Sequence, residues 1–322
     1  MNQTRHLLGW GAAAGMLALI LDSKTALSGA QAGIMLCLKT VIPSLFPFFV
    51  LSGVLMAHCS PVPRIPRLLS GLLPGLTDRM PALLLPAFLG GYPVGAQTLC
   101  QACRDGMLTR EDAQRLLAFS NNAGPAFLFG MAGQIFPQRW MVWLLWLVHI
   151  LGAVFAAHCL PRPDGAPVIA PHVSKAPTDP VGTAVKTMGT VCGWIVLFRT
   201  ILAFLDRWIL FGVSPVLRVL IIGLLELSNG CLELHRIASV PLRFLVCVCL
   251  IDAGGLCVSL QTASVTGGLS LRLYRLGKAL QLLVGFLFGV SLILRTPAPL
   301  LALAPVFLLC KKRYGKQAAS VV

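Results

Sequence analysis

Charged residues are scarce in this sequence. Only 11% of its 322 residues are Asp, Glu, Lys or Arg, whereas 57% are hydrophobic. A soluble domain usually carries about 25% charged residues, so this chain cannot face water along its whole length. It also lacks a hydrophilic block large enough to form a separate soluble domain, and apolar stretches long enough to cross a bilayer recur instead. The composition therefore predicts an integral membrane protein.

Acidic residues are scarcer than basic ones. The sequence has 11 Asp and Glu against 26 Lys and Arg, which gives a net charge of +15. The basic residues mostly flank apolar segments, where Lys and Arg hold loops in the cytoplasm and meet anionic headgroups. We therefore expect the lipid bilayer, and no nucleic acid, as the partner. The basic tail KKRYGK at 311–316 predicts a cytoplasmic C-terminus. The positive charge would also suit a small anionic solute.

Motifs of several enzyme classes are missing as well. No phosphate-binding loop of the GxxxxGK[ST] type occurs, so we expect no ATP hydrolysis. Cys100 and Cys103 form a CxxC pair, but zinc would require two further ligands nearby. The histidines show neither metal-ligand nor catalytic-triad spacing. We predict no enzyme activity, no catalytic residues, no metal and no cofactor.

The apolar segments predict an all-α fold. Candidate membrane segments are 7–27, 34–57, 82–103, 123–136, 140–160, 183–205, 215–233, 242–262, 277–294 and 298–310. Several contain Pro or Gly and two are short, so we expect a polytopic helical bundle of about 8–10 membrane segments with broken or re-entrant helices. Residues 61–79 are typical of an interfacial helix. The Pro-rich stretch 161–180 predicts an exposed linker between an N-terminal membrane half, 1–160, and a C-terminal one, 181–322.

A short pattern recurs in the two halves. The sequence GGYPVGAQT at 90–98 aligns without gaps with GGLCVSLQT at 254–262, with five identical positions in nine. Gly-Gly and Pro interrupt a helix, and inside hydrocarbon the freed backbone groups need partners within the protein. Paired interruptions, one in each half, are typical of a transporter's binding site, where half-helix N-termini meet a polar or anionic solute. Packing of Gly against a neighbouring helix is the alternative interpretation.

Further polar residues lie within the apolar segments. Intramembrane ionisable groups are costly and usually face a cavity or pair with each other. An ion pair of Glu226 or Asp252 with Arg199 is one interpretation, and such a pair could serve only to fix helix orientation. The candidate solute-binding residues are Gly90, Gly91, Tyr92, Pro93, Gly95, Gln97, Ser120, Asn121, Asn122, Pro125, Glu226, Asn229, Asp252, Gly254, Gly255 and Gln261.

Several of these strings resemble a known family. They are LPAFLGGYPVGAQ (85–97), REDAQRLLAFSNNAGPAFLFG (110–130), SLFPFFVLSGVL (44–55), GLLELSNG (223–230) and GGLCVSLQ (254–261). Together they resemble the family of the sporulation integral membrane protein YlbJ, within the superfamily of nucleoside transporters and the Gate domains of FeoB. GGYPVGA and FSNNAGP are the most specific strings.

The resemblance implies a protein of the bacterial cell membrane or the outer forespore membrane that delivers dipicolinic acid, a small rigid dianion, to the forespore. It also implies two related Gate-like halves. Two alternatives stay open: a non-transporting scaffold for sporulation partners, and a transporter of nucleoside-type solutes. Another copy of the chain and other sporulation membrane proteins are the protein partners to consider.

Overall fold

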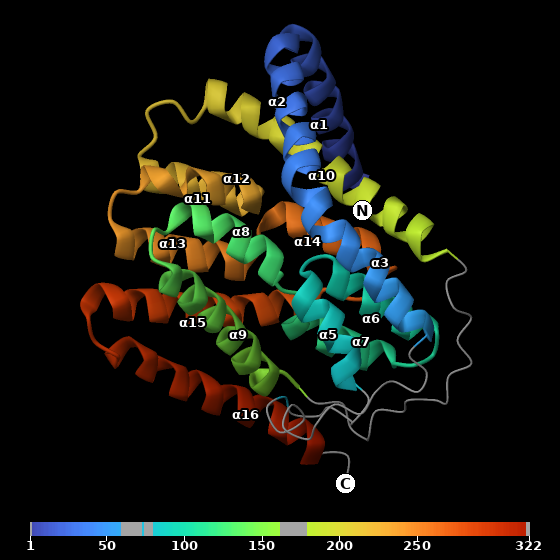
Figure 1. The fold of residues 1–322 in the computed structure, drawn as a ribbon, viewed down its shortest axis with the longest axis vertical. Helices are drawn as coiled ribbons and strands as arrows, with labels where there is room; N and C mark the ends of the chain where they lie inside the picture. The colour runs from blue at the N-terminus through green and yellow to red at the C-terminus, as the bar shows by residue number, and fades with distance from the viewer. Residues whose placement is uncertain (1, 59–72, 74–79, 162–178, 320–322) are drawn as a thin grey trace.

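The computed structural model describes residues 2–58, 73, 80–161 and 179–319, and every regular element in this part is a helix (Figure 1). The predicted all-α class is therefore confirmed. The predicted interfacial helix at 61–79 lies almost wholly outside the described residues, as does most of the predicted linker at 161–180. The division into two related halves stays a prediction.

The described part contains five helical stretches that are long and apolar enough to cross a membrane. They are Ser23–Val54, Arg139–Cys159, Pro180–Trp208, Val240–Val265 and Arg272–Leu294. Gly9–Leu21 and Pro215–Leu225 are apolar but shorter. Large hydrophobic side chains such as Trp10, Phe211 and Leu309 are mostly exposed, as expected where lipid covers the surface. The chain is a polytopic membrane protein.

The N-terminal helices differ from the predicted segments at one boundary. α1 (Asn2–Leu21) and α2 (Ser23–Leu36) meet at Asp22, and α2 continues through a π-helical turn (Cys37–Val41) into α3 (Ile42–His58). The predicted break between residues 27 and 34 is therefore wrong. Asp22 begins α2 because its side chain accepts a hydrogen bond from the backbone N–H of Thr25, 3.2 Å away.

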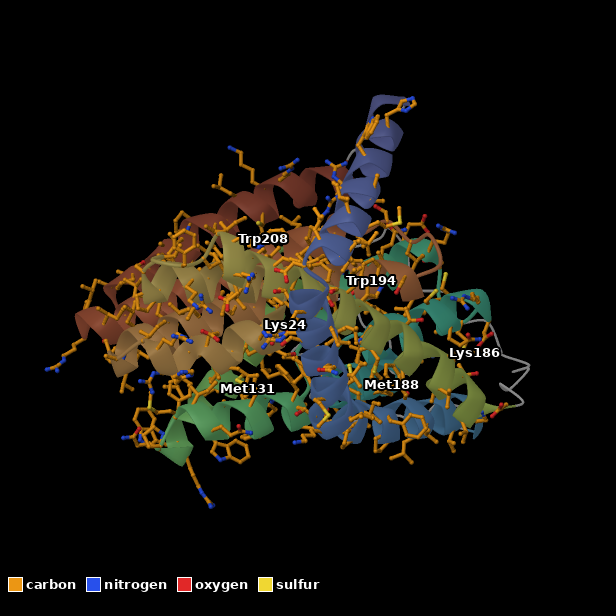
Figure 2. The ribbon with its side chains drawn as sticks, turned by 90° about the horizontal axis from the view of Figure 1, so that it is seen from above. Lys24, Met131, Lys186, Met188, Trp194 and Trp208 are labelled. Carbon is orange, nitrogen blue, oxygen red and sulfur yellow. The ribbon has the colours of Figure 1, made fainter. Side chains whose placement is uncertain are left out.

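The small residues near the wrongly predicted break have a packing role instead. A Cβ atom at Gly29 would lie 2.8 Å from Cβ of Ala203, and one at Gly33 would lie 2.8 Å from Cα of Val196. Both glycines thus allow α2 to lie directly against α10 (Pro180–Trp208). Figure 2 shows the two helices together, with Lys24 labelled on α2 and Trp208 at the end of α10.

Half-helices dominate the middle of the chain. They are α5 (Met80–Gly90) and α6 (Val94–Arg104), α7 (Arg110–Ser120) and α8 (Pro125–Ile135), α11 (Pro215–Leu225) and α12 (Leu227–Glu233), and α13 (Val240–Ala253) and α14 (Gly255–Val265). The predicted breaks near Gly91, Asn122 and Gly254 are confirmed. The predicted segment 215–233 contains a fourth break, at Glu226, because the Glu226 side chain ends one helix and caps the next.

The remaining helices complete the bundle. They are α9 (Arg139–Cys159), a 3₁₀ turn (Leu234–Arg236), α15 (Arg272–Leu294), a second 3₁₀ turn (Ala298–Ala302) and α16 (Leu303–Ala319). α15 lies beside α13 and packs against α9 and α7, so these helices form the centre of the molecule (Figure 1). The helix breaks are packed against this centre, and α1, α2 and α10 lie on the opposite side from α16.

Candidate functional site

The first glycine-rich break depends on close backbone contact. Gly91 has φ of +77°, and a Cβ atom on it would collide with the backbone of Gly124 at the start of α8. A Cβ atom on Gly124 would in turn lie 2.9 Å from the carbonyl carbon of Gly90. Only glycine fits this left-handed conformation at this distance. The α5–α6 break therefore touches the α7–α8 break.

The second glycine-rich break has a similar contact. Gly254 (φ +74°) ends α13 in the left-handed region, and Gly255 (φ +76°) begins α14. A Cβ atom on Gly255 would lie 2.9 Å from the carbonyl oxygen of Gly223, near the end of α11. The α13–α14 break therefore touches the α11–α12 pair.

Tyr92 joins the two glycine-rich breaks. Its hydroxyl donates a hydrogen bond of 2.9 Å to the carbonyl oxygen of Ile251, and a Cβ atom on Gly254 would lie 3.7 Å from the same hydroxyl oxygen. The two interruptions, 164 residues apart in the chain, thus lie side by side, as the paired-break prediction requires.

A small cavity lies where the halves meet. Its wall includes Gly91 and Tyr92 from the first half and Glu226 and Gln261 from the second. The rest of the lining is Val41, Ser44, Leu45, Gly124, Phe127, Val191, Ile195, Leu227, Ser228 and Val258. The space that the centres of water molecules can reach is about 40 Å³. This space is large enough for water, but a larger solute needs the walls to move apart.

Glu226 occupies the N-terminus of α12. Its carboxylate accepts hydrogen bonds from the backbone N–H groups of Ser228 (3.2 Å) and Asn229 (2.8 Å), and from Nδ2 of Asn229 (2.5 Å). Charge-assisted hydrogen bonds at a helix N-terminus are favourable, and the helix dipole adds to them. The positive end of α12 is therefore neutralised by the protein itself, while one side of the Glu226 side chain lines the cavity.

Asn121 and Asn122 connect the α7–α8 break to the second half. Nδ2 of Asn121 donates to Oγ1 of Thr262 (3.0 Å). Oδ1 of Asn122 accepts from Nζ of Lys278 (3.0 Å) and from Nε2 of Gln281 (2.8 Å). All five residues are buried. The two asparagines therefore lie inside a polar network and do not line the cavity.

Asp252 pairs with a histidine rather than an arginine. Its Oδ1 lies 2.5 Å from Nδ1 of His149 on α9, and Nε2 of His149 accepts a hydrogen bond of 3.2 Å from the N–H of Ala123. The predicted ion pair of Arg199 with Glu226 or Asp252 is therefore wrong. Arg199 lies where α10 packs against α2.

The other candidate residues lie around the breaks without lining the cavity. Pro93 precedes α6, and Pro125 is the first residue of α8. A Cβ atom on Gly95 would lie 2.9 Å from Cβ of Ala87, which matches the packing interpretation. Ser120 Oγ and Gln97 Oε1 are buried atoms that have no hydrogen-bond partner in the part of the chain that the structure describes.

Sequence reasoning missed two central residues, His149 and Lys278. Each lies in a mostly apolar helix, and its side-chain partner, Asp252 for His149 and Asn122 for Lys278, is more than 100 residues away in the chain. The spacing of Tyr274, Lys278 and Gln281 at four and three residues, which puts them on one helix face, is the only signal that could have found Lys278. Among the described residues, no group of three His, Cys, Asp or Glu side chains is placed to hold a metal ion.

These features define a class: an all-α integral membrane protein whose broken helices meet around a buried polar centre. The chain is similar to the sporulation integral membrane protein YlbJ of Bacillus subtilis (strain 168), with 28% identity over 142 residues. This alignment covers 42% of the chain and 34% of the relative, so the chain matches about a third of the relative's length. It supports the resemblance to the YlbJ family. No family model and no solved structure matches the chain.

Proposed function

We propose that the protein transports a small solute across the membrane. The observation that carries this proposal is the meeting of two glycine-rich helix breaks at a cavity lined from both halves. Broken helices at membrane depth are tolerated where they line a cavity, and paired breaks at the interface of two halves are a recurrent transporter site. We take the chain as a carrier rather than an enzyme.

Dipicolinate during sporulation is the cargo that we propose first, because the relative is named as a sporulation protein and the resemblance implies this dianion. Two features support an anion. Lys278 places a buried basic side chain beside the α7–α8 break. The N-terminus of α8 has no side-chain cap, and its Gly124 and Phe127 line the cavity. The cavity must widen for dipicolinate to enter.

A neutral nucleoside-type solute is the second candidate, and one observation favours it. Among the described residues, the cavity lining contains the acidic residue Glu226 and the amide residue Gln261 but no Lys or Arg. A carboxylate repels a dianion at short range, whereas both groups can hydrogen-bond the hydroxyls of a sugar. The Glu226 carboxylate therefore disfavours binding of dipicolinate and favours binding of a nucleoside-type solute.

The location follows from the same proposal. We place the protein in the bacterial cell membrane or the outer forespore membrane, with the C-terminus in the cytoplasm. The basic residues Lys311, Lys312 and Arg313 near the end of α16 support this orientation through the positive-inside rule. A further copy of the chain or other sporulation membrane proteins could bind alongside it.

The test is a flux measurement with purified protein in liposomes, using labelled dipicolinate with nucleosides as competitors. We expect saturable dipicolinate uptake that exceeds uptake in protein-free liposomes. Uptake that is abolished by nucleosides, or seen only with labelled nucleosides, would favour the second cargo. Absence of flux for both solutes would overturn the carrier proposal and favour a scaffold. In sporulating cells, the joint replacement Asn121→Leu with Asn122→Leu should abolish dipicolinate accumulation.

A further inference from the structure

His149 and Asp252 form an ionisable pair at the centre of the protein. Both side chains have 0% exposure, and they come from different helices, α9 and α13. An ionised carboxylate buried this way costs several kcal/mol unless it is paired and hydrogen-bonded. The chain keeps this group beside both helix breaks, since Asp252 is two residues before Gly254 and His149 contacts Ala123.

The hydrogen bonds fix the protonation state of this pair. The N–H of Ala123 can only donate, so Nε2 of His149 must accept, and the ring proton is on Nδ1. Nδ1–H then donates to Oδ1 of Asp252. His149 is therefore neutral, and Oδ1 of Asp252 accepts its proton whether or not Oδ2 is protonated. A second proton on Nε2 would break the hydrogen bond to Ala123.

One atom of the pair remains free to take a proton. Oδ2 of Asp252 is buried and has no hydrogen-bond partner among the described residues. It occupies space beside α15 that a side chain on Gly285 would otherwise fill. A proton on Oδ2 would leave both hydrogen bonds of His149 intact. Protonation at this atom is therefore the least disruptive way to neutralise the pair.

The surrounding groups determine what that neutralisation would do. The groups that act electrostatically on Asp252 besides His149 are Lys278 from α15, Tyr92 from the first break, and Cys247 and Cys249 from α13. Lys278 is the only basic side chain among them, and it also hydrogen-bonds to the α7–α8 break. Protonation of Asp252 would leave a charged Lys278 without a counter-charge.

We infer that Asp252, oriented by His149, is a proton-binding site that couples transport of an anionic solute to proton movement. This inference rests on the proposed transport function. One proton enters from water and binds Oδ2 of Asp252, which loses its negative charge. The anionic solute then replaces Asp252 as the counter-charge of Lys278. Proton and anion then enter together. Lys278 also donates a hydrogen bond to Asn122. Replacing its counter-charge therefore also changes the interactions that hold the α7–α8 break.

The test uses the full-length protein in liposomes with an imposed pH gradient. For one proton per solute, a gradient of one pH unit supports up to about tenfold accumulation of dipicolinate. Asp252→Asn keeps the shape and an oxygen that can accept from Nδ1–H, but it cannot take up a proton. This variant should accumulate no more solute with the gradient than without it, whatever its basal rate.

His158→Gln is the matched control. His158 lies on the same helix as His149, but its Nδ1 hydrogen-bonds to the carbonyl oxygen of Val154 one turn earlier. Gradient-driven accumulation should be unchanged in His158→Gln and strongly reduced in His149→Gln. Equal loss in both variants, or normal gradient response in Asp252→Asn, would overturn the assignment.

A second measurement does not depend on transport. Infrared difference spectra between acidic and neutral pH should show a protonated carboxyl band at the acidic pH. The band should vanish in Asp252→Asn and persist in Glu226→Gln. If wild-type protein lacks the band, the proton site is wrong even where flux is observed. If the band is present but neither solute moves, the transport proposal fails and the proton site stands.

Discussion

The break at Glu226 and the break at Asn121–Asn122 solve the same problem in different ways. Glu226 satisfies the N-terminus of α12 with its own carboxylate, through groups only two and three residues away. At the start of α8 no side chain caps the helix. The asparagines there make one local hydrogen bond, from Asn122 to the carbonyl oxygen of Phe119. Their other bonds reach Thr262 on α14 and Lys278 on α15, 141 and 156 residues away in the chain.

The difference indicates which break can move. A break held by its own residues keeps its geometry when neighbouring helices shift, because none of its hydrogen bonds crosses to them. A break held by distant helices changes whenever those helices do. We therefore expect the α11–α12 break to be the rigid wall of the cavity and the α7–α8 break to be the mobile one.

The largest expected effect is on the rigid break. Glu226→Leu removes the acceptor of two backbone N–H groups and one amide, and each buried donor left without a partner costs about 1–3 kcal/mol. We expect a large fall in the thermal unfolding temperature in detergent and little protein in the membrane. Glu226→Gln is the milder control, since it keeps the shape of the side chain.

Glu226→Gln also separates two roles of the carboxylate. If the charge acts on the solute, flux changes while the unfolding temperature stays near that of the wild type. If flux and unfolding temperature fall together, Glu226 is purely a helix cap. An unfolding temperature of Glu226→Leu equal to that of the wild type would contradict the rigid-wall interpretation.

The next effect is on the mobile break. Asn122→Leu removes the acceptor of the buried Lys278 ammonium, and a hydrogen bond to a charged group is worth about 1.5–3 kcal/mol. We expect flux to be lost and the unfolding temperature to fall, but less than in Glu226→Leu. Gln134→Leu on α8, where the amide is exposed and bonds only to Gly130, is the matched control and should leave flux unchanged.

The fold could be predicted from sequence where the signal is local. Gly-Gly pairs, Pro125 and long apolar runs act within a few residues, so they locate three of the four helix-pair breaks. The fourth, at Glu226, was missed because a Glu between Leu residues gives no helix-breaking signal. The boundary at Asp22 was missed because the predicted segments ended at 27 and began again at 34, whereas Gly29 and Gly33 lie within α2 and allow close contact with α10.

The polar centre could be predicted only in part. Asp252 and the asparagines are recognisable because a polar residue in an apolar segment is costly and needs a reason. Their partners are not recognisable, because His149 and Lys278 reach them only after α9, α13 and α15 have packed together. The predicted pairing of Arg199 with an acid rested on charge alone. In the structure Arg199 lies where α10 packs on α2.

A smaller effect is expected at the contact between the two halves. Tyr92→Phe removes one neutral hydrogen bond to the carbonyl oxygen of Ile251 and keeps the ring, whose centroid lies 5.3 Å from Nζ of Lys278. Such a bond contributes about 0.5–1.5 kcal/mol, so the unfolding temperature should fall slightly. A loss as large as that of Asn122→Leu would mean that this hydroxyl, rather than the asparagine network, holds the halves together.

The smallest effect is expected at Asp22, which caps α2 as Glu226 caps α12, but near water. The pKa of Asp22 is lowered below its ordinary value of 3.8, first by hydrogen bonding from Thr25 and then by the charge of Arg207. Nε of Arg207 lies 2.9 Å from the Asp22 carboxylate. A lowered pKa contributes stability that is present above the ordinary value and is lost as the pH falls through the folded-state value. The unfolding temperature of the wild type should thus exceed that of Asp22→Asn slightly at neutral pH and equal it in strong acid. If Asp22→Asn lowered the unfolding temperature at neutral pH as much as Glu226→Leu does, burial would not be what makes a helix cap strong in this protein.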